Sequence, residues 1–333
     1  MKVLFIGGTG RLSKDVAFLA AEKNEVYLLT RGTSDRLRFV FPQYHMIYCD
    51  IRNDIKCKEK LRNLQFDVVV DFLSYKIDDL KNKLSILKGK FMQYIFISSA
   101  TVYCPLDDEI ISESKTTVGN SKWQYAYSKY LCENYLREYC EQDKSFFYTI
   151  VRPYVTYGNT RVPYPLVPRD IRMEWSLVDR IVRKKTIVMF DNGTTVTTLT
   201  HAKDFAKGII GLFGNEKAFG EAFHITESNT TSWEEVLNIM GSILQCEVYK
   251  KNIDKELIYK FMPEYKTVLE GDKARNMRFD NSKIKAVVPE FDCSIPLEKG
   301  LEDMIDFYKA NEDLRKIDED WNHRMDILLE CTV

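Results

Sequence analysis

The sequence carries almost no net charge and has no long apolar run, and each absence excludes a class of protein. Its 48 lysines and arginines nearly balance 49 aspartates and glutamates, so bulk electrostatics attracts neither nucleic acid nor an acidic membrane. The apolar opening Val3 to Ile6 is far too short for a signal or membrane segment, and no later run approaches the roughly 18 residues that a span requires. We therefore expect small-molecule ligands, no nucleic acid and no membrane.

Metal-ligand patterns are missing as well. The 8 cysteines include no CxxC pair, and none stands at metal-ligand spacing from the 4 histidines. His201 and Asp204 lie close together, but no third ligand follows, so we interpret them as structural. We expect no metal site, and the scattered cysteines favour a reducing, cytoplasmic location.

Short β-rich runs alternate with amphipathic segments over the first 155 residues. The predicted strands are Lys2–Ile6, Glu25–Leu29, Met46–Cys49, Asp67–Phe72, Tyr94–Ser98 and Phe147–Val151, and the predicted helices lie near 12–22, 53–63, 77–87 and 123–142. Such alternation is typical of a parallel sheet with helical crossovers. The predicted fold class is α/β, a Rossmann-type doubly wound parallel sheet with a smaller C-terminal α/β substrate domain.

The regular alternation of strand and helix patterns ends after Arg152-Pro153. We predict a dinucleotide-binding domain over 1–160, to which 186–215 returns. We predict a substrate domain over 161–185 and 216–310, and a helical extension over 311–333. An apolar stripe at spacings of three and four runs along 314–329 and must pack on something apolar. Packing within the chain is the simpler interpretation, and a homodimer seam is the alternative.

A glycine-rich turn follows the first predicted strand and leads into a helix. Its residues are Gly7, Gly8, Thr9, Gly10, Arg11 and Leu12. In this context glycines permit a tight turn and a close approach of backbone to pyrophosphate, whose charge the helix start favours. Ser13 occupies the third small position in place of glycine. We predict that this turn holds a dinucleotide.

The second predicted strand ends at Thr30-Arg31 without the carboxylate that would bind a ribose 2′-hydroxyl. Arg31 instead suits a 2′-phosphate, which favours NADP over NAD, although Arg31 could also be a solvated loop residue. Asp50 and Ile51 follow the third strand, where they are placed to meet the adenine.

Of the 19 tyrosines, only Tyr125 has a lysine four positions on. Helical geometry stacks Tyr125 and Lys129 on one face, and the preceding strand ends in Ser98-Ser99. A phenol of pKa about 10 must drop by roughly 2 to 3 units to act as a base near neutrality. A close cation can cause such a shift, so we expect Lys129 and an oxidised nicotinamide to lower the pKa of Tyr125. Ser99 would hold the substrate oxygen.

With these motifs the chain resembles the extended short-chain dehydrogenase/reductase family, especially its NAD(P)-dependent nucleotide-sugar epimerase and dehydratase branch. Gly7 to Ser13 stands at the family's GxxGxxG turn, Ser99 at its catalytic serine or threonine, and Tyr125 with Lys129 at its YxxxK motif. The resemblance implies hydride transfer at a sugar carbinol carbon, with Tyr125 taking the hydroxyl proton. It also implies that Phe72, Leu73, Ser98 and Pro153 line the cofactor.

The sequence departs from that pattern in three places. Ala100-Thr101 replaces the Asp-Glu pair of the 4,6-dehydratases, which argues against dehydration because elimination needs its own acid and base. Thr197 replaces an arginine that holds the nucleotide's diphosphate; Arg161, Arg169, Arg172 or Lys184 could compensate, or each could be solvated. Asp71 to Tyr75 replaces a small-residue stretch beside the cofactor.

Two hypotheses follow. The first is an NAD(P)-dependent epimerase or reductase that acts on a sugar or nucleotide sugar. The second is a catalytically silent, NADP-binding sensor or RNA-associated protein on the same scaffold, which the presence of Ser99, Tyr125 and Lys129 disfavours.

Overall fold

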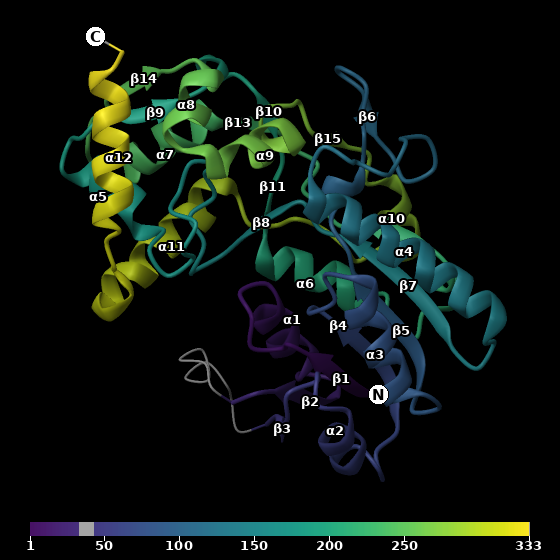
Figure 1. Cartoon of the computed structure of the whole chain (residues 1–333). Helices are drawn as coiled ribbons and strands as arrows, with labels where there is room; N and C mark the ends of the chain where they lie inside the picture. The colour runs from purple at the N-terminus through teal and green to yellow at the C-terminus, as the bar shows by residue number, and fades with distance from the viewer. Residues whose placement is uncertain (33–42, 333) are drawn as a thin grey trace.

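A parallel seven-stranded sheet organises the first lobe of the computed structural model, which describes residues 1–32 and 43–332 (Figure 1). The strand order is β12-β7-β5-β4-β1-β2-β3. The bounds are β1 Lys2–Ile6, β2 Glu25–Thr30, β3 His45–Tyr48, β4 Phe66–Asp71, β5 Phe91–Ile97, β7 Phe147–Arg152 and β12 Ala222–His224. The chain builds outward from β1 first toward β3 and then, from β4, toward β12. This order confirms the predicted doubly wound Rossmann-type sheet.

Helices cover both faces of this sheet because successive residues of a strand point to opposite faces. In β1, Val3 and Phe5 contribute to one apolar core, whereas Leu4 and Ile6 contribute to another. The first core is closed by α1 (Ser13–Ala20) and α6 (Ala202–Ile210), and the second by α2 (Asp54–Lys60), α3 (Ile77–Leu87) and α4 (Gln124–Gln142). Both faces of the central strands are therefore dry, as expected of parallel strands.

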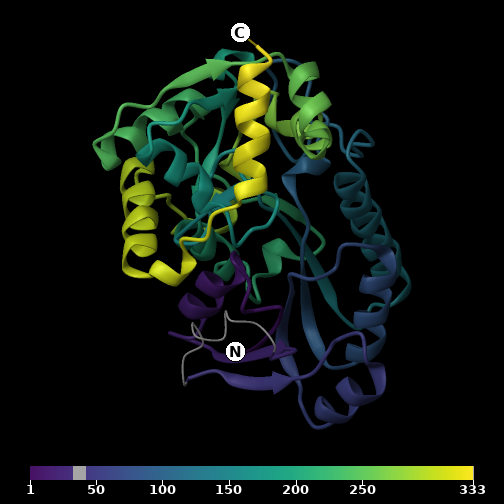
Figure 2. The ribbon, with the colours of Figure 1, turned by 60° about the vertical axis from the view of Figure 1, so that its left-hand side comes forward.

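The second lobe has its own apolar core, built mainly of helices and short strand pairs. Its helices are α5 Trp175–Val182, α7 Trp233–Leu244, α8 Lys255–Phe261, α9 Lys266–Val268, α11 Leu297–Ala310 and α12 Glu319–Glu330. Its strand pairs are β9 (Ile187–Met189) with β14 (Lys250–Asn252), and β10 (Val196–Thr197) with β13 (Thr231–Ser232). Figure 2 shows α12 running along the outside of this lobe toward the C terminus.

The predicted apolar stripe of the last helix packs within the chain. Trp321, Met325 and Leu328 are buried in the core of the second lobe, and Leu314 and Ile317 pack against it. This confirms the simpler of the two interpretations of the stripe.

Two late segments return to the first lobe. Helix α6 packs on α1, and β12 pairs with β7 at the edge of the main sheet. Strand β11 (Leu199–His201) pairs with β8 (Val155–Tyr157). The chain therefore passes from one lobe to the other more than once. The division into domains stays a prediction.

Cys49 and Cys57 form a disulfide, which the scattered cysteine pattern did not predict. Disulfides are typical of oxidising compartments, so this bond lends no support to the predicted cytoplasmic location. Within residues 1–32 and 43–332, no helix combines the length and apolar character needed to cross a membrane.

A buried ion pair ties α4 to the sheet. Arg152, the last residue of β7, donates from Nε and Nη2 to the two carboxylate oxygens of Glu133 at 2.9 and 2.6 Å. The Ser98 hydroxyl donates to the same carboxylate at 2.6 Å. Glu133 lies one helical turn after Lys129, so this pair sets the position of α4 relative to the ends of β5 and β7.

We predict that Glu133→Gln lowers the free energy of unfolding by about 3 to 5 kcal/mol, because it leaves the Arg152 charge buried without its partner. Urea denaturation measures the loss. Arg137→Gln is the matched control, since it removes a half-exposed partner of the same carboxylate and should cost under about 1 kcal/mol. Equal losses in the two variants would contradict the prediction.

Candidate functional site

The glycine-rich turn between β1 and α1 has the shape of a phosphate cradle. Gly7 has a φ of +85°, which favours glycine, and a Cβ on Gly8 would lie 2.6 Å from Leu28 Cδ2. Ser13, at the third small position, closes the turn: its hydroxyl donates to the Gly7 carbonyl at 2.6 Å and accepts from the Gly10 amide at 2.8 Å. The N-cap of α1 is Leu12, whose side chain cannot cap. The first amides of the helix therefore lack a side-chain acceptor and suit an anion.

Arg11 turns its side chain away from the cradle. Its Nη1 forms a 2.7 Å ion pair with Glu174, and its Nη2 donates to the carbonyls of Thr160 and Ile171. The Glu174 carboxylate also accepts from the Val162 amide at 2.9 Å. Thr9, Arg11 and Leu12 can meet a cofactor through their backbone, while the Arg11 guanidinium links the turn to the second lobe.

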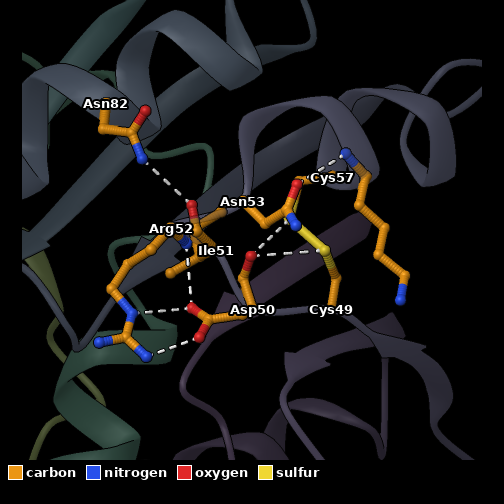
Figure 3. The surroundings of a disulfide bond; sticks show 8 residues. Cys49, Asp50, Ile51, Arg52, Asn53, Cys57 and Asn82 are labelled. Atoms are coloured by element: carbon orange, nitrogen blue, oxygen red, sulfur yellow. Dashed lines mark hydrogen bonds and ion pairs between the residues drawn. A yellow bond between two sulfur atoms is a disulfide. The ribbon is translucent and has the colours of Figure 1, made fainter.

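The adenine end of the predicted cofactor site follows β2 and β3 in the sequence. Figure 3 shows two of its residues, Asp50 and Ile51, next to Arg52 and the Cys49–Cys57 disulfide. Arg52 Nη2 donates to Asp50 at 2.6 Å, and this pairing lowers the pKa of Asp50 to about 2, with Arg31 adding to the effect. The carbonyl of buried Ile51 accepts from Asn82 at 3.2 Å. The structure brings Arg31, Asp50 and Ile51 together, with Asp50 already engaged by Arg52.

The stretch after β4 packs differently from a small-residue loop. Burial raises the pKa of Asp71, but the Lys83 ammonium at 3.2 Å and hydrogen bonds, including those from Ser74 and Tyr94, outweigh burial and hold the pKa below its usual range. Phe72 stacks on Phe5, at 6.3 Å between ring centroids. Leu73 lies against Gly7, where a Cβ on that glycine would come within 2.6 Å of it. Of Phe72 and Leu73, which were both predicted to line the cofactor, Leu73 is therefore the one that borders the glycine-rich turn.

Ser99 and Tyr125 meet at the centre of the candidate site. Ser99 caps a short turn after β5, where its Oγ accepts from the Thr101 hydroxyl at 3.0 Å. Burial and the nearby Tyr75 raise the pKa of Tyr125 to about 12, against opposing effects of a hydrogen bond with Ser99 and the charge of Arg161. Burial thus outweighs the nearby Arg161 charge in setting the pKa of Tyr125, and the predicted lowering, which includes the charge of an oxidised nicotinamide, stays a prediction.

Lys129 is buried beside Tyr75 and has two fixed acceptors. Its Nζ donates to the carbonyls of Ser74 and Ile97 at 2.6 and 2.8 Å, and it lies 4.7 Å from the Tyr75 ring centroid. Burial lowers its pKa to about 8. An ammonium has three N–H donors, so one remains for a ligand hydroxyl.

Ser98 and Pro153, which were predicted to line the cofactor, make hydrogen bonds within the protein instead. The Ser98 hydroxyl is committed to Glu133, and the carbonyl of buried Pro153 accepts from the Ala100 amide at 2.8 Å. Both residues position the backbone around Ser99. His201 caps α6 through its ring, and Asp204 accepts from Lys207, in keeping with the structural roles expected of them.

The residues present fit a dinucleotide. The cradle has no room for side chains at Gly8, the start of α1 is uncapped, and Lys129 retains a donor. Gly7, Gly8 and Gly10 with the α1 amides would hold the pyrophosphate, Arg31 the adenosine end, and Lys129 the ribose next to the nicotinamide.

Sequence reasoning missed two charged residues of this neighbourhood, Asp272 and its partner Lys273, and named a third, Arg161, only as one of several candidates. Arg161 was one of four candidates for replacing a missing arginine, and its charge lowers the pKa of Tyr125, whereas the Asp272 charge raises it. Asp272 and Lys273 carried no signal at all, since charged residues make up 29% of the chain and these two follow no periodic pattern.

Comparisons with known proteins agree with this fold. The model of the NAD dependent epimerase/dehydratase family matches residues 3–225. The chloroplast stem-loop binding protein of 41 kDa b of Arabidopsis thaliana is 28% identical over 237 residues, which cover 68% of this chain. The match spans 58% of that relative's length.

Solved structures of epimerases share the architecture. UDP-glucuronic acid 4-epimerase from Bacillus cereus, in complex with NAD, is 17% identical with a TM-score of 0.73, covering 93% of this chain and 99% of that one. UDP-glucose 4-epimerase from Thermotoga maritima, with UDP-glucose, is 16% identical with a TM-score of 0.70, covering 94% and 100%. At these identities the likeness establishes the fold alone.

We predict that one lysine titrates near pH 8 in ¹³C NMR of the lysine side chains, and that Lys129→Met removes this resonance. Lys76→Met is the control, because Lys76 is an exposed lysine at the start of α3, and this variant should keep the resonance near pH 8. Because the folded pKa of about 8 lies below the ordinary lysine value of 10.5, the folded protein binds fewer protons between these two pH values than the unfolded chain does. The contribution of Lys129 to stability therefore rises with pH across this interval. A Lys129 resonance that titrates at the ordinary lysine value would contradict the burial argument.

Proposed function

Since this chain belongs to the NAD-dependent epimerase/dehydratase family, we propose that it is an NAD(P)-dependent epimerase or oxidoreductase that acts on a hydroxyl or ketone of a sugar or nucleotide sugar. The observation that carries the proposal is the position of Lys129, which is buried at the end of β5 with its Nζ donating to the Ile97 carbonyl at 2.8 Å, one turn of α4 after Tyr125, whose pKa Ser99 lowers. This is the donor and acceptor set that proton transfer at a carbinol carbon requires.

The protonation states suggest how these residues work. Tyr125, with its pKa of about 12, carries its proton at neutral pH and can donate it to a ketone oxygen held by the Ser99 hydroxyl. For the reverse reaction Tyr125 must lose that proton, which a nearby positive charge favours. A bound nicotinamide would supply or accept the hydride. Lys129 would orient the adjacent ribose and add positive charge below pH 8.

The cofactor choice rests on Arg31. No carboxylate ends β2, and within residues 1–32 and 43–332 the carboxylate shown to act together with Arg31 is that of Asp50, which is already paired with Arg52 and therefore competes less with a 2′-phosphate. We propose NADP as the preferred cofactor, with NAD as the alternative, because the similar Bacillus cereus epimerase is in complex with NAD.

A nucleotide sugar is the substrate class that the similar epimerases support, since those proteins are in complex with UDP-glucuronic acid and UDP-glucose. Ala100-Thr101 stands in place of a dehydratase acid-base pair, so we propose epimerisation or reduction in preference to dehydration. A cytoplasmic location and a possible homodimer stay predictions.

A second candidate function is RNA association without catalysis. The observation in its favour is the similarity to the chloroplast relative, which is named a stem-loop binding protein. Against it stands the net charge of −1, which gives no bulk attraction to nucleic acid.

We predict that Tyr125→Phe lowers turnover by about 10²- to 10⁴-fold, because it removes the proton donor, and that Ser99→Ala lowers turnover in the same direction. Oxidation of NADPH or NADH in the presence of ketosugars or nucleotide ketosugars measures the rate. Tyr127→Phe, an exposed tyrosine on the same helix, is the control and should keep wild-type turnover. Full activity of Tyr125→Phe would exclude the mechanism.

A parallel experiment separates the two candidates. We expect no fluorescence anisotropy change when a labelled RNA stem-loop is titrated with the protein at 0.15 M salt. Tight stem-loop binding, combined with an unchanged NADPH spectrum across the sugar panel, would favour the RNA-associated protein.

A further inference from the structure

The loop that follows β4 carries a buried ion pair that the proposed reaction does not use. Asp71 is the last residue of β4, and Lys83 lies in α3. Lys83 Nζ lies 3.2 Å from Asp71 Oδ1, and both side chains are buried. A buried ion pair often contributes little net stability, because both charges lose their water on folding. Stability alone therefore does not explain why this pair lies beside the candidate site.

Asp71 and Lys83 hold Ser74 between them, and we call these three residues the Asp71 triad. Asp71 Oδ1 accepts from the amides of Leu73 and Ser74 at 2.8 and 3.2 Å. The Ser74 hydroxyl donates to Asp71 Oδ2 and accepts from Lys83 Nζ at 2.7 Å. The Tyr94 hydroxyl on β5 also donates to Asp71 Oδ2, at 2.7 Å. Hydrogen bonds to charged groups are stronger than neutral ones, so the triad fixes the loop at Ser74.

The same loop supplies contacts of Lys129. The Ser74 carbonyl accepts from Lys129 Nζ at 2.6 Å, and the ring centroid of Tyr75, the next residue, lies 4.7 Å from that nitrogen. The Ile97 carbonyl accepts a second N–H at 2.8 Å. An ammonium has three N–H donors in a tetrahedral arrangement, so fixing two of them fixes the direction of the third. The position of Ser74 therefore decides where Lys129 presents its remaining donor.

Charged groups from three elements act on Lys129. Burial lowers its pKa, and among the nearby charges the Asp71 carboxylate on β4 opposes that shift most strongly. Glu133 on α4 also opposes the shift, whereas Lys83 on α3 adds to it. Cys132 is a further titratable neighbour, and burial raises the pKa of its thiol to about 12, so the thiol is uncharged near neutrality. The charge of Lys129 thus depends on both ions of the triad.

We propose that the Asp71 triad is a positioning unit for Lys129, the residue that would hold the ribose of the cofactor. The triad fixes the loop after β4, and that loop fixes the ammonium through the Ser74 carbonyl. The Asp71 carboxylate also keeps the ammonium charged against the effect of burial, while Lys83 balances the carboxylate. This inference rests on the proposed function and deepens it, since it gives the stretch from Asp71 to Tyr75 a role in holding Lys129.

¹³C NMR of the lysine side chains, on protein without added cofactor, tests the triad without turnover. Asp71→Asn removes the carboxylate that favours the charged ammonium, so the titration of Lys129 should move to lower pH by about one pH unit. Lys83→Met removes a competing cation and should move the titration to higher pH. A role in folding alone predicts a move to higher pH in both variants, because loosened packing would expose Lys129 to water.

Two exposed residues of α3 provide matched controls. Lys81→Met is the control for Lys83→Met, because Lys81 lies on the same helix with its side chain in solvent. Asp78→Asn, which removes an exposed acid from the first turn of α3, is the control for Asp71→Asn. Both control variants should leave the titration of Lys129 near pH 8.

Ser74→Ala separates the hold on the loop from the two charges. It keeps the ion pair and removes the hydroxyl that joins the two ions, so Lys129 should still titrate near pH 8. NADPH or NADH, whichever the wild type binds more tightly, should bind this variant about fivefold more weakly, the effect of losing one hydrogen bond. Fluorescence of the reduced nicotinamide measures the affinity, and Lys81→Met should bind the cofactor as the wild type does.

The double variant Asp71→Asn/Lys83→Met covers the case in which Asp71→Asn alone leaves the Lys83 charge buried without its partner and does not fold. The double variant differs from Lys83→Met by the loss of the carboxylate. Its Lys129 should therefore titrate at lower pH than in Lys83→Met.

The outcomes separate this inference from the proposed function. An unchanged or raised titration of Lys129 on loss of the Asp71 carboxylate, or full cofactor affinity in Ser74→Ala, would overturn the positioning unit even in an active enzyme. The expected shifts and the weaker cofactor binding, in a protein that transfers no hydride to or from any sugar, would leave the unit standing and would remove the enzymatic proposal instead.

Discussion

The buried pair of Glu133 and Arg152 is the interaction on which the candidate site depends. It joins the middle of α4 to the end of β7, and the Ser98 hydroxyl adds the end of β5 to the same carboxylate. Tyr125 and Lys129 lie within the two turns of α4 that precede Glu133. Because a bidentate pair fixes both distance and orientation, the phenol and the ammonium are held at the carboxyl edge of the sheet.

Burial shifts the pKa values of Tyr125 and Lys129 in opposite directions, but both shifts favour the uncharged form of the side chain. It raises the pKa of Tyr125 and lowers that of Lys129, so in each case the uncharged form gains. The site as folded is therefore set for proton donation by the phenol. Proton abstraction needs additional positive charge from a ligand, which makes the charge state of whatever binds there part of the chemistry.

The two lobes meet through charged residues near the cradle and not only through apolar packing. Arg11 reaches from the glycine-rich turn to Glu174 and to the Thr160 and Ile171 carbonyls, so the segment that follows β8 is attached to the cofactor side. The same segment carries Arg161, whose charge lowers the pKa of Tyr125. A ligand in the cradle and a ligand beside Tyr125 would thus contact neighbouring parts of one connected network.

The sequence by itself determined the sheet, the glycine-rich turn and the pairing of Tyr125 with Lys129, because strand alternation, glycine spacing and helical stacking are local properties of the chain. Only the tertiary structure decided the state and surroundings of those residues. Lys129 meets carbonyls from the loop after β4 and from the end of β5, Arg11 turns to the second lobe, and the charge of Asp272 acts on Tyr125 from about 150 residues away in the sequence. Such contacts depend on how distant segments pack, and burial, which sets the pKa of Tyr125, exists only once they have packed.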